Sequence, residues 1–295
     1  SNVEDEATGT LLIDGIVGDI TNLDVNDIES VSLLKDAASA AIYGVRAANG
    51  VILISTKKGK TGEPIIKYHG GIGVSEPYKT PNRVGAFEYA TMYNAALNND
   101  GSALRYTSDD LNKWKTGSSP NSHPDNDQYE QLINSGNGIR NFHNISASGG
   151  TEKTKYLLSF GHFKENGIIE LFDYSRTNYR LNLEQTIGAN GKLKVGVNLS
   201  GAIAKQSGST QLAGGLVENA YTAHPGDVVQ YENGLWAAGQ DWNAASGTNA
   251  IAFVKGPLGT FDQNYNDYIN SIFAEYDVTN DIKIRGRVTY RNDNK

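Results

Sequence analysis

The sequence has no cysteine among its 295 residues, and positive charge is scarce. The lack of cysteine excludes a disulfide scaffold and any thiolate catalyst or metal ligand. The 26 basic residues are outnumbered by 33 acidic ones, which gives a formal net charge of -7. Because binding to nucleic acid needs a positive surface, this balance argues against a nucleic-acid partner.

Long hydrophobic runs are also missing. No apolar segment approaches the roughly 20 residues of a membrane-spanning helix, and the mean hydropathy is -0.45. These values are typical of a soluble protein. Membrane β-barrels give similar values, however, because their strands alternate apolar and polar residues. Hydropathy therefore leaves both classes open.

A compact α/β unit is predicted over residues 10–57. Residues 10–15 end in a glycine turn and indicate a short buried strand. Residues 50–56 are a continuous, mostly β-branched run, which predicts a strand buried on both faces. Between them, residues 37–43 are rich in alanine and stop at Gly44, which predicts a helix with a glycine end.

Three shorter segments complete this part of the chain. Asn26 is followed three positions later by Glu29, which predicts the cap of a helix. Residues 30–35 favour a strand, because their apolar residues alternate with serines. Residues 57–64 have the composition of a linker.

Beyond residue 64 the pattern changes to alternation with period two, which predicts seven strands. The predicted strands are 65–74, 140–148, 155–163, 178–187, 192–204, 268–278 and 282–290. Their connections alternate between short turns and long segments, and the long ones are 76–139, 164–173 and 206–266. Outer-membrane barrels have this asymmetry, whereas loops of this size are uncommon in compact soluble domains. Residues 84–97, within a long connection, have helical character.

The clearest alternation is in residues 192–204. Val195, Val197 and Leu199 share one face, and Lys194 and Asn198 share the other. In a soluble sandwich the apolar face packs on a second sheet, whereas in a membrane barrel it meets lipid. Alternation alone does not separate these two arrangements.

One block of the sequence resembles the end of the plug domain in the SusC/RagA family, the TonB-dependent outer-membrane transporters of Bacteroidetes. The similar segments are Leu12-Ile13-Asp14-Gly15, Asn26-Asp27-Ile28-Glu29-Ser30-Val31, Leu34-Lys35-Asp36-Ala37-Ala38-Ser39-Ala40-Ala41-Ile42-Tyr43-Gly44, and Arg46-Ala47-Ala48-Asn49-Gly50-Val51-Ile52-Leu53-Ile54-Ser55-Thr56-Lys57-Lys58-Gly59. Residues 144–154 and 193–201 resemble early barrel strands of the same family. The sequence departs from the family at Val45, where serine is usual, and at Ser55, where threonine is common.

The resemblance implies a 22-stranded antiparallel transmembrane β-barrel with a small α/β plug inside. Residues 1–64 are then the C-terminal part of the plug with its linker, and residues 65–295 are the first seven or so barrel strands. Seven strands in these 231 residues use 33 residues each, so a full barrel needs roughly 700 residues. Seven strands are also fewer than the roughly eight of the smallest membrane barrels. The chain is therefore expected to be a piece of a longer protein, in which the segment that contacts TonB precedes Ser1.

The function implied by the resemblance is TonB-dependent import of glycan fragments or oligopeptides across the outer membrane. The implied partners are a SusD-type surface lipoprotein acting as a lid, TonB and outer-membrane lipid. The chain is interpreted as non-enzymatic, with no cofactor. The alternative is a soluble or surface-exposed β-rich module for carbohydrate binding or adhesion, which requires a second sheet over Val195, Val197 and Leu199.

Two groups of residues are candidates for function. The plug signature comprises Asp14, Gly15, Asp36, Tyr43, Gly44, Arg46, Asn49 and Gly50. Arg46 either pairs with a carboxylate of the barrel wall or lies in a solvated turn, and both aspartates fit structural turns. The lack of a lysine-serine/threonine ending and of the glycine spacing at 44–50 argues against a phosphate loop.

Aromatic residues of the long connections are the candidate ligand or lid contacts, because sugars stack on aromatic rings and aromatics anchor interfaces. They are Trp114, Tyr129, Tyr231, Trp236 and Trp242. Packing of the loops on themselves is the competing interpretation. A further set of tyrosines is expected in interfacial girdles of the barrel: Tyr156, Tyr179, Tyr268, Tyr276 and Tyr290.

Metal and catalytic motifs are weak. The five histidines are scattered, with no pair at a spacing of four. Asp125, Asp127 and Glu130 resemble part of a calcium loop but lack its glycine, so a solvated acidic loop is favoured. No Gly-x-Ser-x-Gly elbow occurs, and no pair of carboxylates stands out as a glycosidase site.

Overall fold

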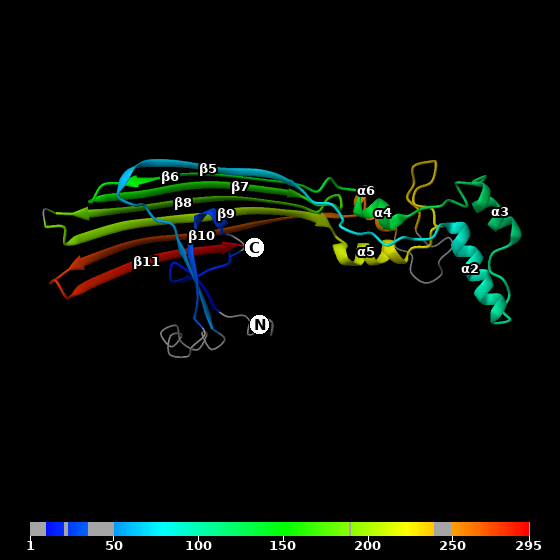
Figure 1. Ribbon diagram of the computed structural model, residues 1–295, viewed down its shortest axis with the longest axis horizontal. Coiled ribbons are helices and arrows are strands. Elements are labelled where there is room, and N and C mark those ends of the chain that lie inside the picture. The colour runs from blue at the N-terminus through cyan, green and yellow to red at the C-terminus, as the bar shows by residue number, and fades with distance from the viewer. Residues whose placement is uncertain (1–9, 21–22, 35–49, 189, 239–248, 295) are drawn as a thin grey trace.

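The computed structural model describes residues 10–20, 23–34, 50–188, 190–238 and 249–294. It consists of a long seven-stranded sheet, a small four-stranded sheet that projects from one of its faces, and a group of helices at one end (Figure 1). Within the ranges described, the helices are all too short or too polar to cross a membrane.

The small sheet has the strand order β2-β1-β4-β3. Its strands are β1 (Thr10–Ile13), β2 (Ile16–Val17), β3 (Ile28–Leu34) and β4 (Val51–Thr56). β4 is central and pairs in parallel with β1 and antiparallel with β3. Val51 and Ile54 of β4 are buried and Ile52 and Leu53 half-buried, so the predicted strand with two covered faces is confirmed.

The cap predicted at Asn26 is wrong. Residues Val25–Asp27 form a single 3-10 turn, η3, and Asp24 caps it by accepting a hydrogen bond from the Asn26 backbone N–H at 2.8 Å. The chain then enters β3 at Ile28, because the alternating apolar residues pair with β4 instead of continuing a helix. The predicted strand over 30–35 is thus confirmed through Leu34, while the predicted helix over 37–43 lies outside the described residues.

The large sheet is an antiparallel meander in which neighbours in sequence are neighbours in space. Its strands are β5 (Gly62–Val74), β6 (Ile139–Gly150), β7 (Thr154–Asn166), β8 (Asp173–Ile187), β9 (Leu193–Ser209), β10 (Thr260–Asp277) and β11 (Lys283–Asn294). Each of the seven predicted strands corresponds to one of these. β10 begins eight residues earlier than predicted, because residues 260–267 are polar but pair along β9. The connection predicted over 164–173 shrinks to residues 167–172.

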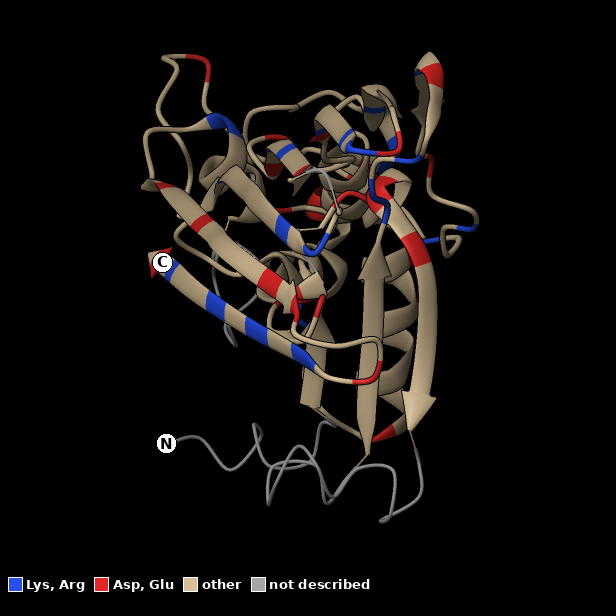
Figure 2. Ribbon diagram, turned by 90° about the vertical axis from the view of Figure 1, so that its left-hand side faces the viewer, with Lys and Arg blue, Asp and Glu red and all other residues tan. Residues whose placement is uncertain are grey.

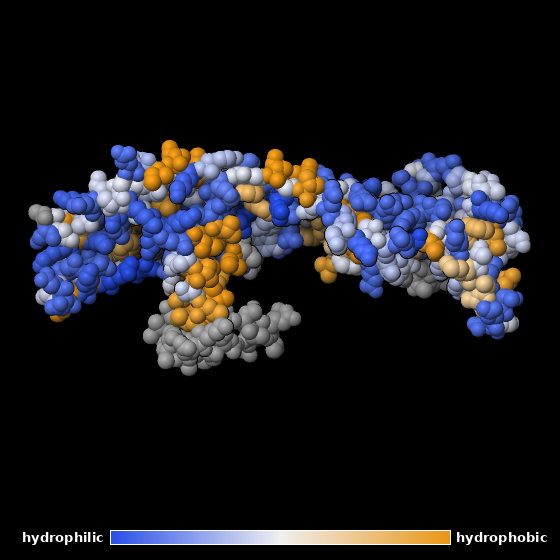
Figure 3. All heavy atoms as spheres, viewed as in Figure 1, coloured by the Kyte–Doolittle hydropathy of each residue, from blue (hydrophilic) through white to orange (hydrophobic). Residues whose placement is uncertain are grey.

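The two faces of the large sheet differ in polarity. The inner face, toward the small sheet, carries Arg180, Asn182, Asn198 and Ser271. The outer face carries large exposed apolar side chains, which include Ile66, Ile72, Ile145, Leu158, Phe160, Leu183, Ile203, Ile272, Ile284 and Val288. Figure 3 shows hydrophobic groups along the side of the sheet away from the small sheet. In the described part of the chain, no second sheet packs on this face.

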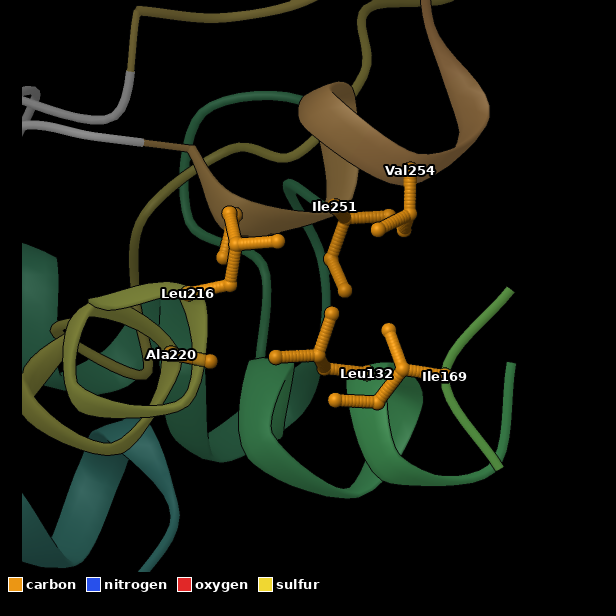
Figure 4. Packing of buried hydrophobic residues seen from close by; sticks show 7 residues of the cluster. Leu132, Ile169, Leu216, Ala220, Ile251 and Val254 are labelled. Carbon is orange, nitrogen blue, oxygen red and sulfur yellow. The ribbon is translucent and has the colours of Figure 1, made fainter. Parts of the chain in front are cut away.

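The helices belong to the two longest connections and gather at one end of the large sheet (Figure 1). They are α2 (Ala86–Asn99), α3 (Ser108–Thr116), α4 (Gln128–Ile133), α5 (Ala213–Thr222) and α6 (Ala250–Lys255). The helix predicted over 84–97 is confirmed as α2. Apolar side chains of α4, α5 and α6 form a common core (Figure 4), whose buried members are Leu132, Ile169, Leu216, Ala220, Ala250, Ile251 and Val254.

Candidate functional site: the polar interface between the two sheets

Arg180 of β8 is the centre of the contact between the two sheets. Its Nε lies 3.4 Å from Asp27 Oδ2 and its Nη1 lies 3.1 Å from Thr56 Oγ1. The same Nη1 is 3.7 Å from Asp14 Oδ2. The side chains of Arg180 and Asp27 are each only 7% exposed. A cation from the large sheet therefore reaches two carboxylates of the small sheet in a site with little water.

Asp14 has its position fixed by the turn between β1 and β2. Its φ is 50° and that of Gly15 is 82°, the left-handed region that suits glycine and is tolerated by aspartate. The Asp14 carboxylate accepts hydrogen bonds from the backbone N–H and the hydroxyl of Thr56. The turn thus joins β1 to the end of β4 and presents Asp14 to Arg180.

Further polar contacts extend the interface on both sides of Arg180. Asn144 of β6 donates to Asp24 Oδ2 at 2.9 Å. On β11, Arg287 donates to the Asp14 carbonyl at 3.0 Å and Arg291 donates to the Val17 carbonyl at 2.6 Å. The donors lie on the large sheet, where Figure 2 shows the basic residues as blue bands along β11, and the acceptors lie on the small sheet or on the η3 segment between β2 and β3. The two surfaces are therefore electrostatically complementary.

Burial dominates the electrostatics of Asp27. It raises the pKa of the Asp27 carboxyl above its ordinary value, and this outweighs the hydrogen bond from Ser159 and the positive charge of Arg180. The small sheet has its own apolar cores, one around Leu12 and Val51 and another around Ile13, Leu23 and Ile54. Water can replace hydrogen bonds at a polar interface at a modest net cost. Ile13 and Leu23 of the second core also line the gap between the sheets, beside Tyr179 and Arg180, so the contact combines polar pairs with some apolar packing.

The predicted plug signature is only partly within the described residues. Asp14 and Gly15 form the turn between β1 and β2, and Gly50, at φ 91°, directly precedes β4 and accepts a hydrogen bond from the Thr10 N–H. Asp36, Tyr43, Gly44, Arg46 and Asn49 lie outside the described residues, as does the predicted pairing of Arg46 with the wall. The ion pairs of Arg180 reverse this predicted arrangement, because the arginine lies on the large sheet and its carboxylate partners are Asp14 and Asp27. In the sequence, Arg180 stands between Tyr179 and Leu181 in a predicted strand, which indicates a polar face, and this alternation is the signal that could have pointed to it.

The comparisons with known proteins agree with this arrangement. Residues 5–51 match the family model of the TonB-dependent receptor plug domain. TonB-dependent receptor SusC of Bacteroides thetaiotaomicron is 27% identical over 288 residues, which cover 90% of this chain and 26% of SusC. TonB-dependent receptor P39 of Formosa agariphila is 32% identical over 201 residues, 65% of this chain and 17% of P39. The structure of the RagAB peptide transporter superposes with a TM-score of 0.74 at 25% identity, covering 97% of this chain and 34% of that one.

The chain belongs to the SusC/RagA-type TonB-dependent receptors. It spans about a quarter of the length of SusC. The fold is accordingly that of a plug-type sheet against part of a large antiparallel sheet, and the described strands do not close into a barrel.

The receptor's candidate ligand contacts differ in exposure. Trp114 is buried, with ring centroids 5.5 Å from Tyr106 and 4.9 Å from His123, so its ring packs within the loop, and its contact with a ligand or lid stays a prediction. Tyr129 is half-buried beside Tyr221.

The other candidate ligand contacts also differ in exposure. Tyr231 is exposed, whereas Trp236 is half-buried against the helical core. Trp242 lies outside the described residues.

The five tyrosines predicted for girdles all lie on the outer face of the receptor's large sheet. Tyr179 and Tyr268 are neighbours near the middle of β8 and β10, with ring centroids 6.4 Å apart. Tyr276 pairs with Leu193 near the short turns, and Tyr156 and Tyr290 lie between these rows. Their assignment to membrane interfaces stays a prediction.

The acidic residues that resembled a calcium loop have structural partners. Asp125 accepts a hydrogen bond from the Ala86 N–H at 2.8 Å, at the start of α2. Asp127 caps α4 and pairs with Arg83 at 3.0 Å. Over the described ranges, histidines and carboxylates form no cluster of three that could hold a metal ion.

Proposed function

We propose that the receptor imports a nutrient across the outer membrane in a TonB-dependent manner, with glycan fragments or oligopeptides as cargo. The proposal includes a 22-stranded barrel, of which residues 65–295 supply the first seven or so strands, and residues 1–64 as the end of the plug with its linker. A SusD-type lipoprotein is the proposed lid. Relatives named SusC and the RagAB peptide transporter support this function.

The observation that carries the proposal is the polar contact of Arg180 with Asp14 and Asp27 behind an apolar outer face. Val195, Val197 and Leu199 lie on that outer face, while Lys194 and Asn198 lie on the inner face. A membrane barrel needs this orientation, with lipid outside and a polar lumen inside. The alternative, a soluble adhesion module, needs a second sheet over the outer face, and the described residues contain none.

The geometry suggests how transport proceeds. In the resting receptor the small sheet occupies the lumen and is held by hydrogen bonds and ion pairs to β6, β8 and β11. A pull by TonB on a segment before the plug then puts these contacts under tension. Water then replaces the donors of the wall, and the small sheet moves away from Arg180 to open a path for the cargo.

An engineered cross-link tests this function. Asp24→Cys with Asn144→Cys joins two residues whose side chains are hydrogen-bonded at 2.9 Å, in a chain with no native cysteine. Full-length receptor carrying both changes is expressed in cells that lack the native gene, with oligosaccharides or peptides as the sole carbon source. We expect growth only after the disulfide is reduced, because the oxidised link holds the plug against the wall.

Each single-cysteine variant is the matched control and should import under both conditions. Growth of the oxidised double variant at the wild-type rate contradicts the proposed plug movement. If deletion of the gene leaves growth on every substrate unchanged, the import function itself is wrong. Extraction of the receptor into aqueous buffer without detergent contradicts its place in the membrane.

A further inference from the structure

A recess of about 510 Å³ opens in the helical region, away from the interface of the two sheets. Its volume is within the range of small-molecule sites. Pro120, Pro124, Val228, Val229, Ile251 and Trp236 supply apolar surface. The polar groups that line it include Asn126, Gln131, Gln230 and Lys255.

The Trp236 ring is held in place on the wall of the recess. It packs against the core cluster that contains Leu132 and Ile251 (Figure 4) and remains only half-buried. A fixed, partly exposed indole presents a flat apolar surface, which favours stacking of a ring over binding of a flexible chain.

Lys255 gives the recess a positive charge. The residue is exposed at the end of α6, and no hydrogen bond or ion pair to another described residue engages its side chain. Asp125 also lines the recess, but its carboxylate accepts from the Ala86 N–H at the start of α2, a helix without a capping side chain of its own. The charge of Asp125 is therefore directed to the positive end of α2.

The amides of the recess can bind hydroxyl groups. Gln230 donates its Nε2 to the Gly234 carbonyl at 3.0 Å, which fixes the side chain and leaves its Oε1 as an acceptor. Asn126 is fixed in the same way by donation to the Asp227 carbonyl at 2.9 Å. Fixed amides beside an aromatic ring suit a ligand with many hydroxyls.

We propose that this recess binds an oligosaccharide that contains uronic acid. The sugar carboxylate pairs with the Lys255 ammonium, a sugar ring lies on Trp236, and hydroxyls bond to the amides of Asn126 and Gln230. A neutral sugar would leave Lys255 facing the bound ligand without a counter-charge. That such a sugar is cargo rests on the proposed import function, whereas its binding does not.

Titration calorimetry on the full-length receptor in detergent tests the site. The probes are tetramers of galacturonate, glucuronate and mannuronate, each compared with the matching neutral tetramer. We expect at least one uronate to bind roughly tenfold more tightly than its neutral counterpart, and Lys255→Met to remove most of that difference. Added salt should weaken uronate binding, because the pair is exposed.

Lys79→Met is the matched control, since Lys79 is exposed in the connection from β5 to α2 and does not line the recess. Lys255→Gln serves as a second variant, and the thermal unfolding curves of all variants are compared with that of the wild type. The proposal is overturned if no uronate binds, if folded Lys255→Met and Lys255→Gln bind as the wild type does, or if neutral tetramers bind equally well. Intact binding with no growth defect in the deletion strain refutes import alone.

Discussion

The Arg180 Nε of β8 lies 3.4 Å from Asp27 Oδ2, although 153 residues separate the two in sequence. Both side chains are almost fully buried, so removal of one leaves a buried charge without its partner. The pair therefore couples the position of the small sheet to that of the large sheet.

Arg180→Met should weaken docking of the small sheet by about 3–5 kcal/mol, the usual effect of breaking a buried ion pair. The measurement is entry of a large antibiotic into cells that express the full-length variant, because a loosened plug leaves the lumen of the proposed barrel open. Lys283→Met is the control, since Lys283 pairs with Glu275 and Asp277 of its own sheet. Equal leakage through both variants would refute a role of Arg180 in holding the plug.

His224 makes the helical region sensitive to acid. Its Nδ1 accepts a hydrogen bond from the Gly226 N–H at 2.9 Å, so the neutral ring carries its proton on Nε2, which lies 3.0 Å from the Tyr106 hydroxyl. Burial, together with the charge of Arg105, lowers the pKa of His224 to about 4, and burial raises the pKa of Tyr106 to about 12.

Because the folded state holds fewer protons than the unfolded state below pH 6.5, stability of the helical region should fall as the pH drops from about 6.5 to about 4. The loss is on the order of 3 kcal/mol. Hydrogen exchange of the α2 and α3 amides at pH 7 and pH 5 measures it. In His224→Gln the difference between the two pH values should shrink, whereas His143→Gln, on the outer face, should keep it.

Val288 and Thr289 are neighbours in β11 that point to opposite faces of the large sheet. Val288 pairs with Ile272 in the middle of the apolar outer face, and Thr289 pairs with Ser271 on the inner face. Val288→Arg should cost about 2–4 kcal/mol in a bilayer, which lowers the amount of assembled receptor. Thr289→Arg should assemble normally, and equal yields of the two variants in membranes would contradict the assignment of faces.

Gly50 directly precedes β4 and has φ 91°, and a Cβ there would lie 3.1 Å from the Leu34 carbonyl oxygen. Gly50→Ala should destabilise the small sheet by about 1–2 kcal/mol, because an L-residue is strained in this conformation. Faster hydrogen exchange in β1 and β4 is the expected readout. Gly286→Ala, at a position with open space for a Cβ, is the control and should leave exchange in these strands unchanged.

Local patterns predicted the elements well and their ends less well. Alternation located all seven strands of the large sheet, because successive side chains point to opposite faces and the two faces differ in polarity. It missed the first half of β10, whose polar residues form a strand only through pairing with β9. The residues around Asn26 match the sequence pattern of a helix cap, but β3 forms there instead of a helix because it pairs with β4.

The sequence by itself determined the strands, their two faces, the helix α2 and the family, since these depend on residue order and short-range periodicity. Only the tertiary structure decided that Arg180 meets Asp14 and Asp27, that Trp114 is buried while Trp236 lines a recess, and that Lys255 shares that recess. Such contacts join residues that are far apart in sequence, and no local period encodes which side chains the folded chain brings together.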